Sequence, residues 1–299
     1  MVQTPGRGLS SGSLDELGDR MVAAWDSFVD LADNVDLAAP SRLPGWRGHE
    51  VLVHLGSWDE SSPLATAVLS ARSGGAGAPY DPDAANAALV EKHRDATRSE
   101  VLDALRRSRD RAAELRDSRD LRDLATEPTM SSLGPLPFAG LVHAGCYELA
   151  VHALDLRPCG APEPDADLLD AGLAALIDVT GALAARQGIV ASVVAQTPAG
   201  GWRMAVDATS WSTYRTAPGK VDGPAVLGSA TDILDASAGR AMAPVLLVQR
   251  RLVVQEMTQF LKLAPLVEQV PGIPGAALLR RAAGAVGGVT SVLGRLRGR

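Results

Sequence analysis

Apolar residues in the first half of the chain recur at the three- and four-residue spacing that is typical of amphipathic helices. The first such run consists of Leu14, Leu17, Met21, Trp25, Phe28 and Leu31. Ser13 followed by Glu16 fits a capping box, so this helix is predicted to start near Leu14. Similar patterns predict three further helices, at about 47–72, 83–124 and 138–156. The second of these has a break signal near Thr97. Residues 13–157 are therefore predicted to form a four-helix bundle.

A Pro-rich segment then separates two kinds of pattern. Residues 157–167 read RPCGAPEPDAD, which predicts a linker over 158–167. A helix is expected next, at 168–187. Short β-branched or alternating runs predict strands at 190–197, 201–208, 210–216 and 225–229. With a short helix at 231–238, residues 168–244 are predicted to form an α+β domain with an antiparallel sheet, followed by a helical extension over 245–299.

Composition narrows the class of protein. The net charge of −6 argues against general nucleic-acid binding, and no stretch is as long and uniformly apolar as a spanning helix requires. Residues 1–12 are short and rich in Gly and Ser, so we expect a disordered N-terminus that is not a signal peptide, and a cytoplasmic protein. The two cysteines, Cys146 and Cys159, form no CxxC pair, which excludes a disulfide framework and a Cys-rich zinc site.

The C-terminal end has its own charge pattern. Residues 269–299 contain five arginines and no acid, and apolar residues approximate one stripe between them. This pattern predicts a basic amphipathic helix that orders on contact with a surface. We expect this helix to dock on its own protein or on a second subunit, and not on an anionic membrane surface. Docking on a second subunit would give a homo-oligomer.

A carboxylate and an imidazole lie one helical turn apart in the last predicted helix of the bundle. At 100° per residue, Glu148 and His152 are about 40° apart, so both can reach one ion. His54 lies midway along a different amphipathic helix, whereas His49 and His143 fall off the ligand face. Two histidines and one glutamate leave a tetrahedral position open, as in catalytic metal sites. On spacing alone, a hydrogen-bonded core histidine and a surface Glu–His pair remain alternatives.

Further residues carry candidate roles. Arg240 follows Gly239 at the end of a predicted short helix, where its planar fork could bind a substrate carboxylate as a catalytic residue. The alternative is a surface arginine that pairs with helix C-terminal carbonyls. Asp155 lies on the ligand face and either orients a ligand histidine or neutralises the helix end beside Arg157. Cys146 falls on the opposite side of the helix from the ligands, which favours a structural thiol.

Three segments carry a family resemblance. They read LPGWRGHEVLVHL (43–55), ELAVHALDL (148–156) and VDGPAVLGSATDILDASAGR (221–240). The first two resemble the signature segments of the mycothiol-dependent maleylpyruvate isomerase family, and the third resembles that family's C-terminal domain. The resemblance implies an α plus α/β chain of two domains: a DinB-like four-helix bundle, and an α+β sterol-carrier-like domain with an antiparallel sheet and a helical tail. The metal ligands that it implies are His54, Glu148 and His152.

The resemblance also implies the chemistry. The ligand types favour Zn²⁺, and the family's cosubstrate is the low-molecular-weight thiol mycothiol. Its sulfur would take the open metal position, lose its proton and add to a small-molecule electrophile, in an isomerase or an S-transferase. Where the family has an arginine before the glutamate and a polar residue after the histidine, this chain has Tyr147 and Ala153, so the electrophile stays open. Two other functions also stay open: a non-enzymatic binder of apolar ligands or a partner protein, and a metal-dependent hydrolase.

Overall fold

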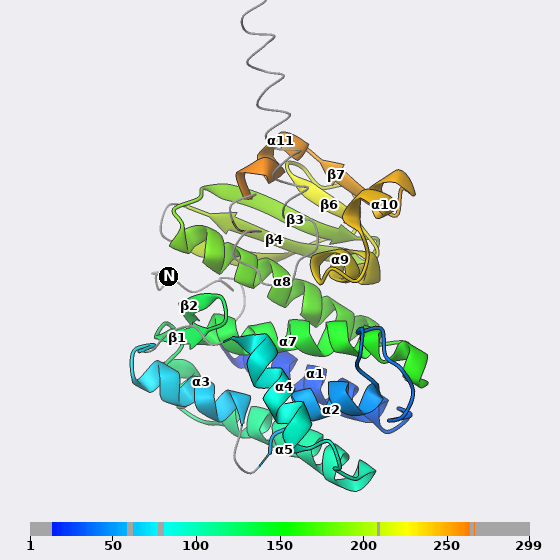
Figure 1. Ribbon diagram of the computed structural model, residues 1–299. Helices are drawn as coiled ribbons and strands as arrows, with labels where there is room; N and C mark the ends of the chain where they lie inside the picture. Colours follow the sequence, from blue (N-terminus) through cyan, green and yellow to red (C-terminus); the bar gives the residue numbers. More distant parts are fainter. Residues whose placement is uncertain (1–13, 59–61, 77–80, 208–209, 264–265, 267–299) are drawn as a thin grey trace, which may run out of the picture.

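The computed structural model describes residues 14–58, 62–76, 81–207, 210–263 and 266. A helical part forms the lower half of the molecule in Figure 1, and a sheet with its helices forms the upper half. Two long helices, α7 (Phe138–Asp155) and α8 (Ala166–Arg186), pack against each other where the two parts meet. The predicted fold class, a helical N-terminal part followed by an α+β part, is confirmed.

The helical part contains shorter helices than the sequence predicts. The bounds are α1 (Leu14–Ala32), α2 (Gly48–Leu55), α3 (Pro63–Arg72), α4 (Pro82–Lys92), α5 (Arg98–Asp117) and α6 (Asp120–Asp123). The predicted helix 47–72 is two helices, because Ser62 caps a new helix that has Pro63 at its first position. The predicted helix 83–124 is divided as well, and the expected break near Thr97 is confirmed. Thr97 and Glu100 form a capping box that starts α5.

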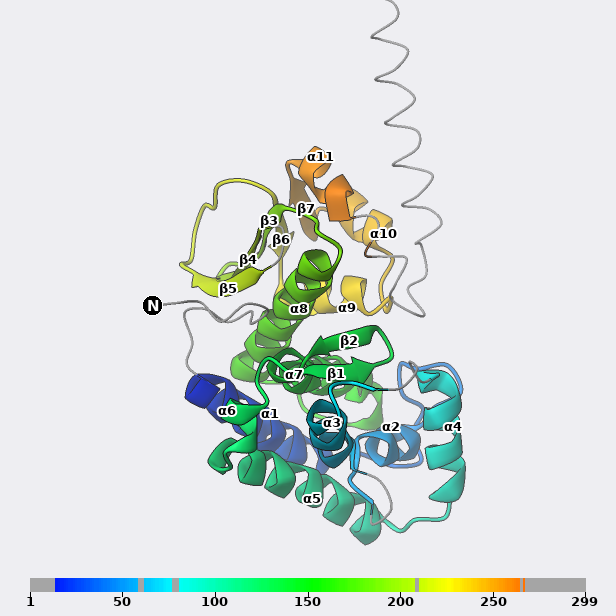
Figure 2. The ribbon, with the colours of Figure 1, turned by 90° about the vertical axis from the view of Figure 1, so that its left-hand side faces the viewer.

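A hairpin lies between the predicted helices 83–124 and 138–156. Strands β1 (Pro128–Ser131) and β2 (Gly134–Pro137) pair in antiparallel fashion just before α7. Pro and Gly dominate this segment and no alternating apolar run marks it, so the hairpin is not predictable from the sequence. Gly134 has a φ of +85°, a value that favours glycine and closes the turn. The hairpin covers one end of α7, as Figure 2 shows.

The C-terminal part is a five-stranded sheet in the order β5-β4-β3-β6-β7. Its strands are β3 (Ala191–Thr197), β4 (Gly200–Val206), β5 (Trp211–Thr216), β6 (Ala225–Gly228) and β7 (Leu252–Gln255). The sheet is antiparallel as predicted except at one pairing, since β6 runs parallel to β3, with Val194 opposite Ala225. Helices α8 and α9 (Ala230–Ser237) lie on one face of this sheet.

The chain beyond 244 departs from the predicted helical extension. After α10 (Ala243–Val248) it forms strand β7, which pairs with β6 and completes the sheet. Helix α11 (Met257–Phe260) and a short 3₁₀ turn (Leu261–Leu263) follow. The sheet therefore includes residues beyond the predicted domain boundary. The predicted basic helix in 269–299 and the predicted disordered segment 1–12 lie outside the described residues.

A buried polar cluster joins the two parts of the molecule. Asp178 of α8 accepts hydrogen bonds from Trp211 and Thr213 of β5, at 2.9 and 2.7 Å, and lies 3.1 Å from Nδ1 of His143 on α7. Helices α7 and α8 approach so closely that a Cβ on Gly172 would overlap the side chain of Ala150. The bundle and the sheet are therefore held in a fixed arrangement by close packing and by buried hydrogen bonds.

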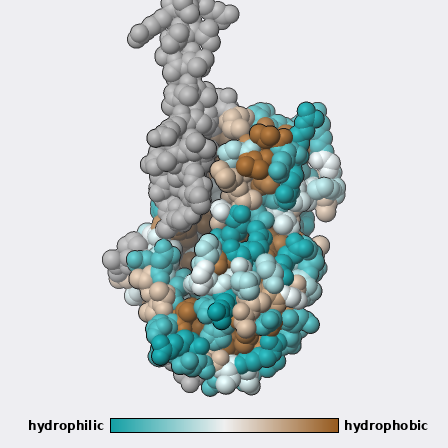
Figure 3. All heavy atoms as spheres, turned by 45° about the vertical axis from the view of Figure 1, so that its right-hand side comes forward, coloured by the Kyte–Doolittle hydropathy of each residue, from teal (hydrophilic) through white to brown (hydrophobic). Residues whose placement is uncertain are grey.

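The most apolar helix, α8, is buried, and the exposed apolar side chains lie elsewhere. Within the described residues, α8 alone is long and apolar enough to cross a membrane, but 72% of that stretch is buried against the rest of the protein. It is the central helix of the core. Exposed apolar side chains gather instead toward the end of the described chain, at Met242, Val245, Val248, Val253 and Met257. Figure 3 shows brown apolar surface on this upper half of the molecule.

Candidate metal centre

The structure brings together the three residues that the sequence proposes as ligands. His54, Glu148 and His152 each offer one ligand atom, and these atoms all lie within 4.8 Å of one another. On α7, Nε2 of His152 is 3.4 Å from Oε2 of Glu148. The ring centroids of His54 and His152 are 5.3 Å apart, with the rings nearly perpendicular. Three donors from α2 and α7 therefore converge on one point, as a metal site requires.

Local structure explains how His54 reaches this point. It lies in the last turn of α2, whose start is capped by Glu50: its carboxylate accepts the backbone N–H of Arg47 at 2.7 Å. The ring of Trp46 packs edge-on against the His54 ring, with centroids 5.7 Å apart. Among the described residues, Nδ1 of His54 is buried without a hydrogen-bond partner. A buried ring nitrogen without a partner is costly, and its presence argues against the alternative of a hydrogen-bonded core histidine.

Asp155 fixes the orientation of His152. Its carboxylate lies 3.1 Å from Nδ1 of His152 and is fully buried. Because Nδ1 faces Asp155, Nε2 is the nitrogen that points to Glu148 and is available as a ligand. Of the two roles that the sequence left open for Asp155, this geometry favours the orienting one. Arg157, beside which the alternative role placed Asp155, pairs with Glu163 at 2.5 Å.

The charges in the cluster support one another. Burial acts to lower the pKa of His152, but hydrogen bonds to Asp155 and Glu148 outweigh it and raise that pKa to about 9. Desolvation acts to raise the pKa of Glu148, whose side chain is 53% exposed, but the two histidines outweigh it and hold the pKa well below its usual range. Without a metal, the cluster therefore holds a carboxylate beside an imidazolium. Metal binding there would displace the proton of His152.

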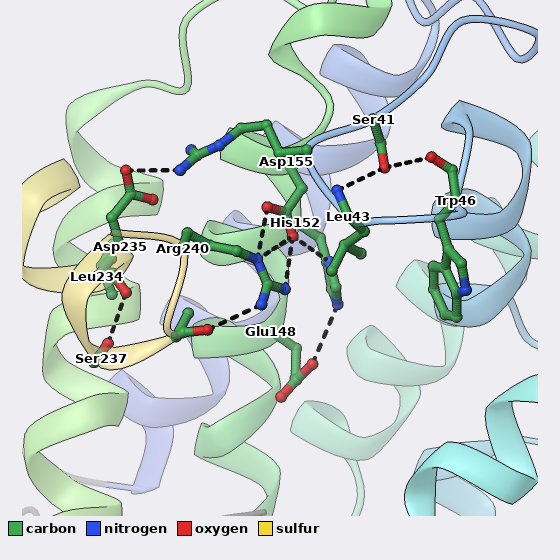
Figure 4. A network of polar contacts seen from close by, with 12 residues as sticks. Ser41, Leu43, Trp46, Glu148, His152, Asp155, Leu234, Asp235, Ser237 and Arg240 are labelled. Atoms are coloured by element: carbon green, nitrogen blue, oxygen red, sulfur yellow. Dashed lines mark hydrogen bonds and ion pairs between the residues drawn. The ribbon is translucent and has the colours of Figure 1, made fainter. Parts of the chain in front are cut away.

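Arg240 reaches the same cluster from the C-terminal part, as Figure 4 shows. Its Nε lies 2.9 Å from Oδ1 of Asp155, and its Nη2 lies 3.0 Å from Oδ2. Its Nη1 donates to the carbonyl of Ala238 at 2.9 Å. The turn after α9 thus aims this arginine toward the site, as the sequence analysis expects. Its direct partner is Asp155, which that analysis did not anticipate.

One family model matches the helical part of the chain. Residues 19–157 match the family model described as the mycothiol maleylpyruvate isomerase N-terminal domain. The three proposed ligands all lie inside the matched segment, whereas Arg240 lies outside it. None of the curated proteins matches the chain.

Two solved structures resemble the chain over most of its length. One is described as a crystal structure of a mutant of the mycothiol-dependent maleylpyruvate isomerase. It is 19% identical, covers 78% of this chain and 92% of that chain, and has a TM-score of 0.51. A second, described as the crystal structure of the mycothiol-dependent maleylpyruvate isomerase, is 19% identical, covers 79% and 93% of the two chains, and has a TM-score of 0.48. The first likeness shows that the shared fold extends beyond the family domain into the sheet-bearing part.

The remaining candidates from the sequence lie away from the cluster. Nε2 of His49 is 3.2 Å from the carbonyl of Ala96, and His143 is buried against Asp178. Both positions agree with the prediction that these histidines are not ligands. Cys146 is fully buried, and burial raises its thiol pKa to about 12. A thiol with that pKa is inert as a nucleophile near neutral pH.

Two contacts beside the cluster were missed by the sequence analysis. The guanidinium of Arg42 pairs with Asp235 of α9 at 2.9 Å. The hydroxyl of Tyr147 on α7 lies 3.1 Å from the hydroxyl of Ser237, also on α9. Tyr147 stands where the family pattern has an arginine, and this departure was the one available signal. The sequence does not reveal these contacts, because the two residues of each pair are far apart along the chain.

Proposed function

We propose that the protein is a metal-dependent enzyme that uses a low-molecular-weight thiol, mycothiol, to attack an electrophilic small molecule. The product would be an isomer if the thiol leaves again, and a thioether if it stays. The observation that carries this proposal is the convergence of His54, Glu148 and His152 within 4.8 Å, inside a domain of the mycothiol maleylpyruvate isomerase family. The donor set suits a divalent cation, with Zn²⁺ favoured.

The chain's own residues have distinct tasks in this proposal. His54, Glu148 and His152 would hold the cation and leave a position for the thiol. A bound divalent cation lowers the pKa of a thiol, so that thiolate is present near neutral pH. The side chain of Glu148 is exposed whereas that of His152 is buried, so we expect small molecules to reach the site past Glu148. Neither protein cysteine supplies the nucleophile, because Cys146 and Cys159 are both buried away from the ligands.

Arg240 is our candidate for binding a substrate carboxylate. A guanidinium has five N–H donors, and the contacts with Asp155 and Ala238 use one on Nε, one on Nη1 and one on Nη2. Two donors therefore remain for an anionic substrate. The side chain is 22% exposed, so part of it remains open to solvent. An unsaturated acid is accordingly the substrate class to test first.

The experiment measures metal and thiol in turn. Metal content is determined for the purified wild type, for His152→Ala and for the control His49→Ala, which changes a histidine of α2 outside the cluster. We expect one metal per chain in the wild type and the control, and loss of metal in His152→Ala. Equal metal in all three would sink the ligand assignment.

The metal-loaded protein is then screened with mycothiol against unsaturated acids and other electrophiles. The readouts are loss of free thiol, which reports transfer, and the absorbance change of a cis–trans conversion, which reports isomerisation. We expect turnover only when mycothiol is present. Turnover without any added thiol would refute the thiol-dependent mechanism, and metal binding with no turnover across the screen would favour a non-enzymatic binder.

A further inference from the structure

Three polar contacts connect α9 and the turn after it to the helical part around the candidate metal centre. We call these contacts the α9 latch. They are Arg42–Asp235 at 2.9 Å, Tyr147–Ser237 at 3.1 Å and Asp155–Arg240 at 2.9 Å. Figure 4 shows Asp235, Ser237 and Arg240 on the same side of the site, facing His152 and Asp155. The latch therefore joins the C-terminal part directly to the surroundings of one proposed ligand.

Asp155 is the central residue of the latch. Its side chain has 0% exposure, and its two carboxylate oxygens are contacted from two directions. His152 approaches Oδ2 through Nδ1, and Arg240 grips both oxygens through Nε and Nη2. The backbone carbonyl of Asp155 also accepts the N–H of Arg42 at 3.0 Å. A carboxylate held on all sides in this way can take one orientation, and so can the imidazole that it contacts.

We propose that Asp155 and Arg240 are positioning residues for the metal centre. Arg240, supplied by the C-terminal part, fixes the Asp155 carboxylate. Asp155 then accepts the Nδ1–H of His152 and presents Nε2 of that ring as a metal ligand. Metal affinity in the N-terminal domain thus depends on a residue from outside the matched family segment. This inference rests on the proposed metal site, and it is separate from any contact of Arg240 with substrate.

The test is a set of metal affinities for the full-length chain. Zn²⁺ dissociation constants are measured by competition with a chromophoric chelator, without substrate or thiol, for the wild type, Asp155→Asn, Arg240→Gln and the double variant. Loss of an outer hydrogen-bond partner of a ligand histidine typically weakens metal affinity by about 10–100-fold. We expect a loss of this size in both single variants. The double variant should bind no more weakly than Asp155→Asn, because Arg240 acts through Asp155.

Two further variants separate positioning from general weakening of the interface. Arg240→Lys keeps the charge but loses the two-pronged grip, so it should recover part of the affinity that Arg240→Gln loses. The control is Arg215→Gln, which removes an ion pair with Asp170 at 2.6 Å in the C-terminal part, remote from the cluster. Its metal affinity should equal that of the wild type.

Bound Co²⁺ supplies a readout that a purely structural salt bridge would not move. The visible spectrum of Co²⁺ reports the geometry of its ligands, so the cobalt-saturated Asp155→Asn protein should differ from the wild type, while Arg215→Gln should not. Unchanged Zn²⁺ affinity in Asp155→Asn, with a wild type that binds metal, overturns the positioning role and leaves the metal site intact. Additive losses in the double variant overturn the part assigned to Arg240. A wild type that binds no metal removes both this inference and the proposed metal site.

Discussion

Asp178 supplies the sharpest test of how the two parts of the molecule are held together. Replacement by alanine removes the acceptor of the Trp211 indole N–H, the Thr213 hydroxyl and the Nδ1 side of His143, at 2.9, 2.7 and 3.1 Å. All three donors are buried, so water does not readily replace the lost carboxylate. An unsatisfied buried donor costs about 1–3 kcal/mol, and the hydroxyl can rotate toward another acceptor. We therefore expect Asp178→Ala to lower the free energy of unfolding by roughly 3–5 kcal/mol.

The isosteric variant Asp178→Asn should lose much less. Its amide oxygen can still accept from Trp211 and Thr213, while its NH₂ group faces His143. His143 can adapt by moving its proton to Nε2, an atom that already lacks a partner among the described residues. The expected loss is about 1 kcal/mol, the value of one ordinary hydrogen bond. The assay is urea unfolding of metal-free protein followed by tryptophan fluorescence, with Arg94→Ala as an exposed-site control.

The same carboxylate predicts a pH dependence. Burial acts to raise the pKa of Asp178, but its hydrogen bonds from His143, Thr213 and Trp211 outweigh burial and lower the pKa. A lowered folded-state pKa contributes stability that is fully present above the unfolded value of about 4, and this stability is lost as the pH falls through the folded value. The stability advantage of the wild type over Asp178→Asn should therefore shrink below about pH 4. A loss under 1 kcal/mol in Asp178→Ala, or a constant difference between wild type and Asp178→Asn from pH 7 to pH 3, would refute this reasoning.

Three further predictions follow from packing and burial. Gly172→Ala forces apart α7 and α8 and should destabilise the protein by about 1–3 kcal/mol. Gly145→Ala has open space around its Cβ and should stabilise the protein by about 0.5–1 kcal/mol. The urea midpoints of the two variants should therefore shift in opposite directions. Cys146 and Cys159 should not react with a thiol reagent in the native protein and should both react after denaturation, and rapid labelling of either native thiol would contradict the assigned burial. Thr97→Ala removes the cap of α5 and should cost about 1 kcal/mol, so an unchanged thermal midpoint would argue against the capping box.

Local signals account for the parts of the fold that the sequence predicts well. The Thr97 capping box and the apolar spacing of α1 act within a few residues, so they can be recognised without the rest of the chain. The errors fall where pairing is long-range. Strand β7 is a short apolar run after a helix, and only its partner β6 makes it a strand. The parallel pairing of β3 with β6 likewise depends on the path of the intervening chain, which no local pattern encodes.

The candidate site likewise combines features that local sequence predicts with contacts that form only between distant parts of the chain. The spacing of Glu148 and His152 follows from helix geometry, whereas His54 lies on a different helix, so its approach to the pair depends on how the helices pack. Arg240 was predicted from its turn, yet its partner Asp155 lies 85 residues earlier in the chain. Because such a pairing exists only in the folded protein, the sequence predicted a substrate carboxylate or helix C-terminal carbonyls as partners of Arg240, and not Asp155. The geometry gives Arg240 a second role that does not need substrate. Its guanidinium already binds the carboxylate of Asp155, and that carboxylate orients His152.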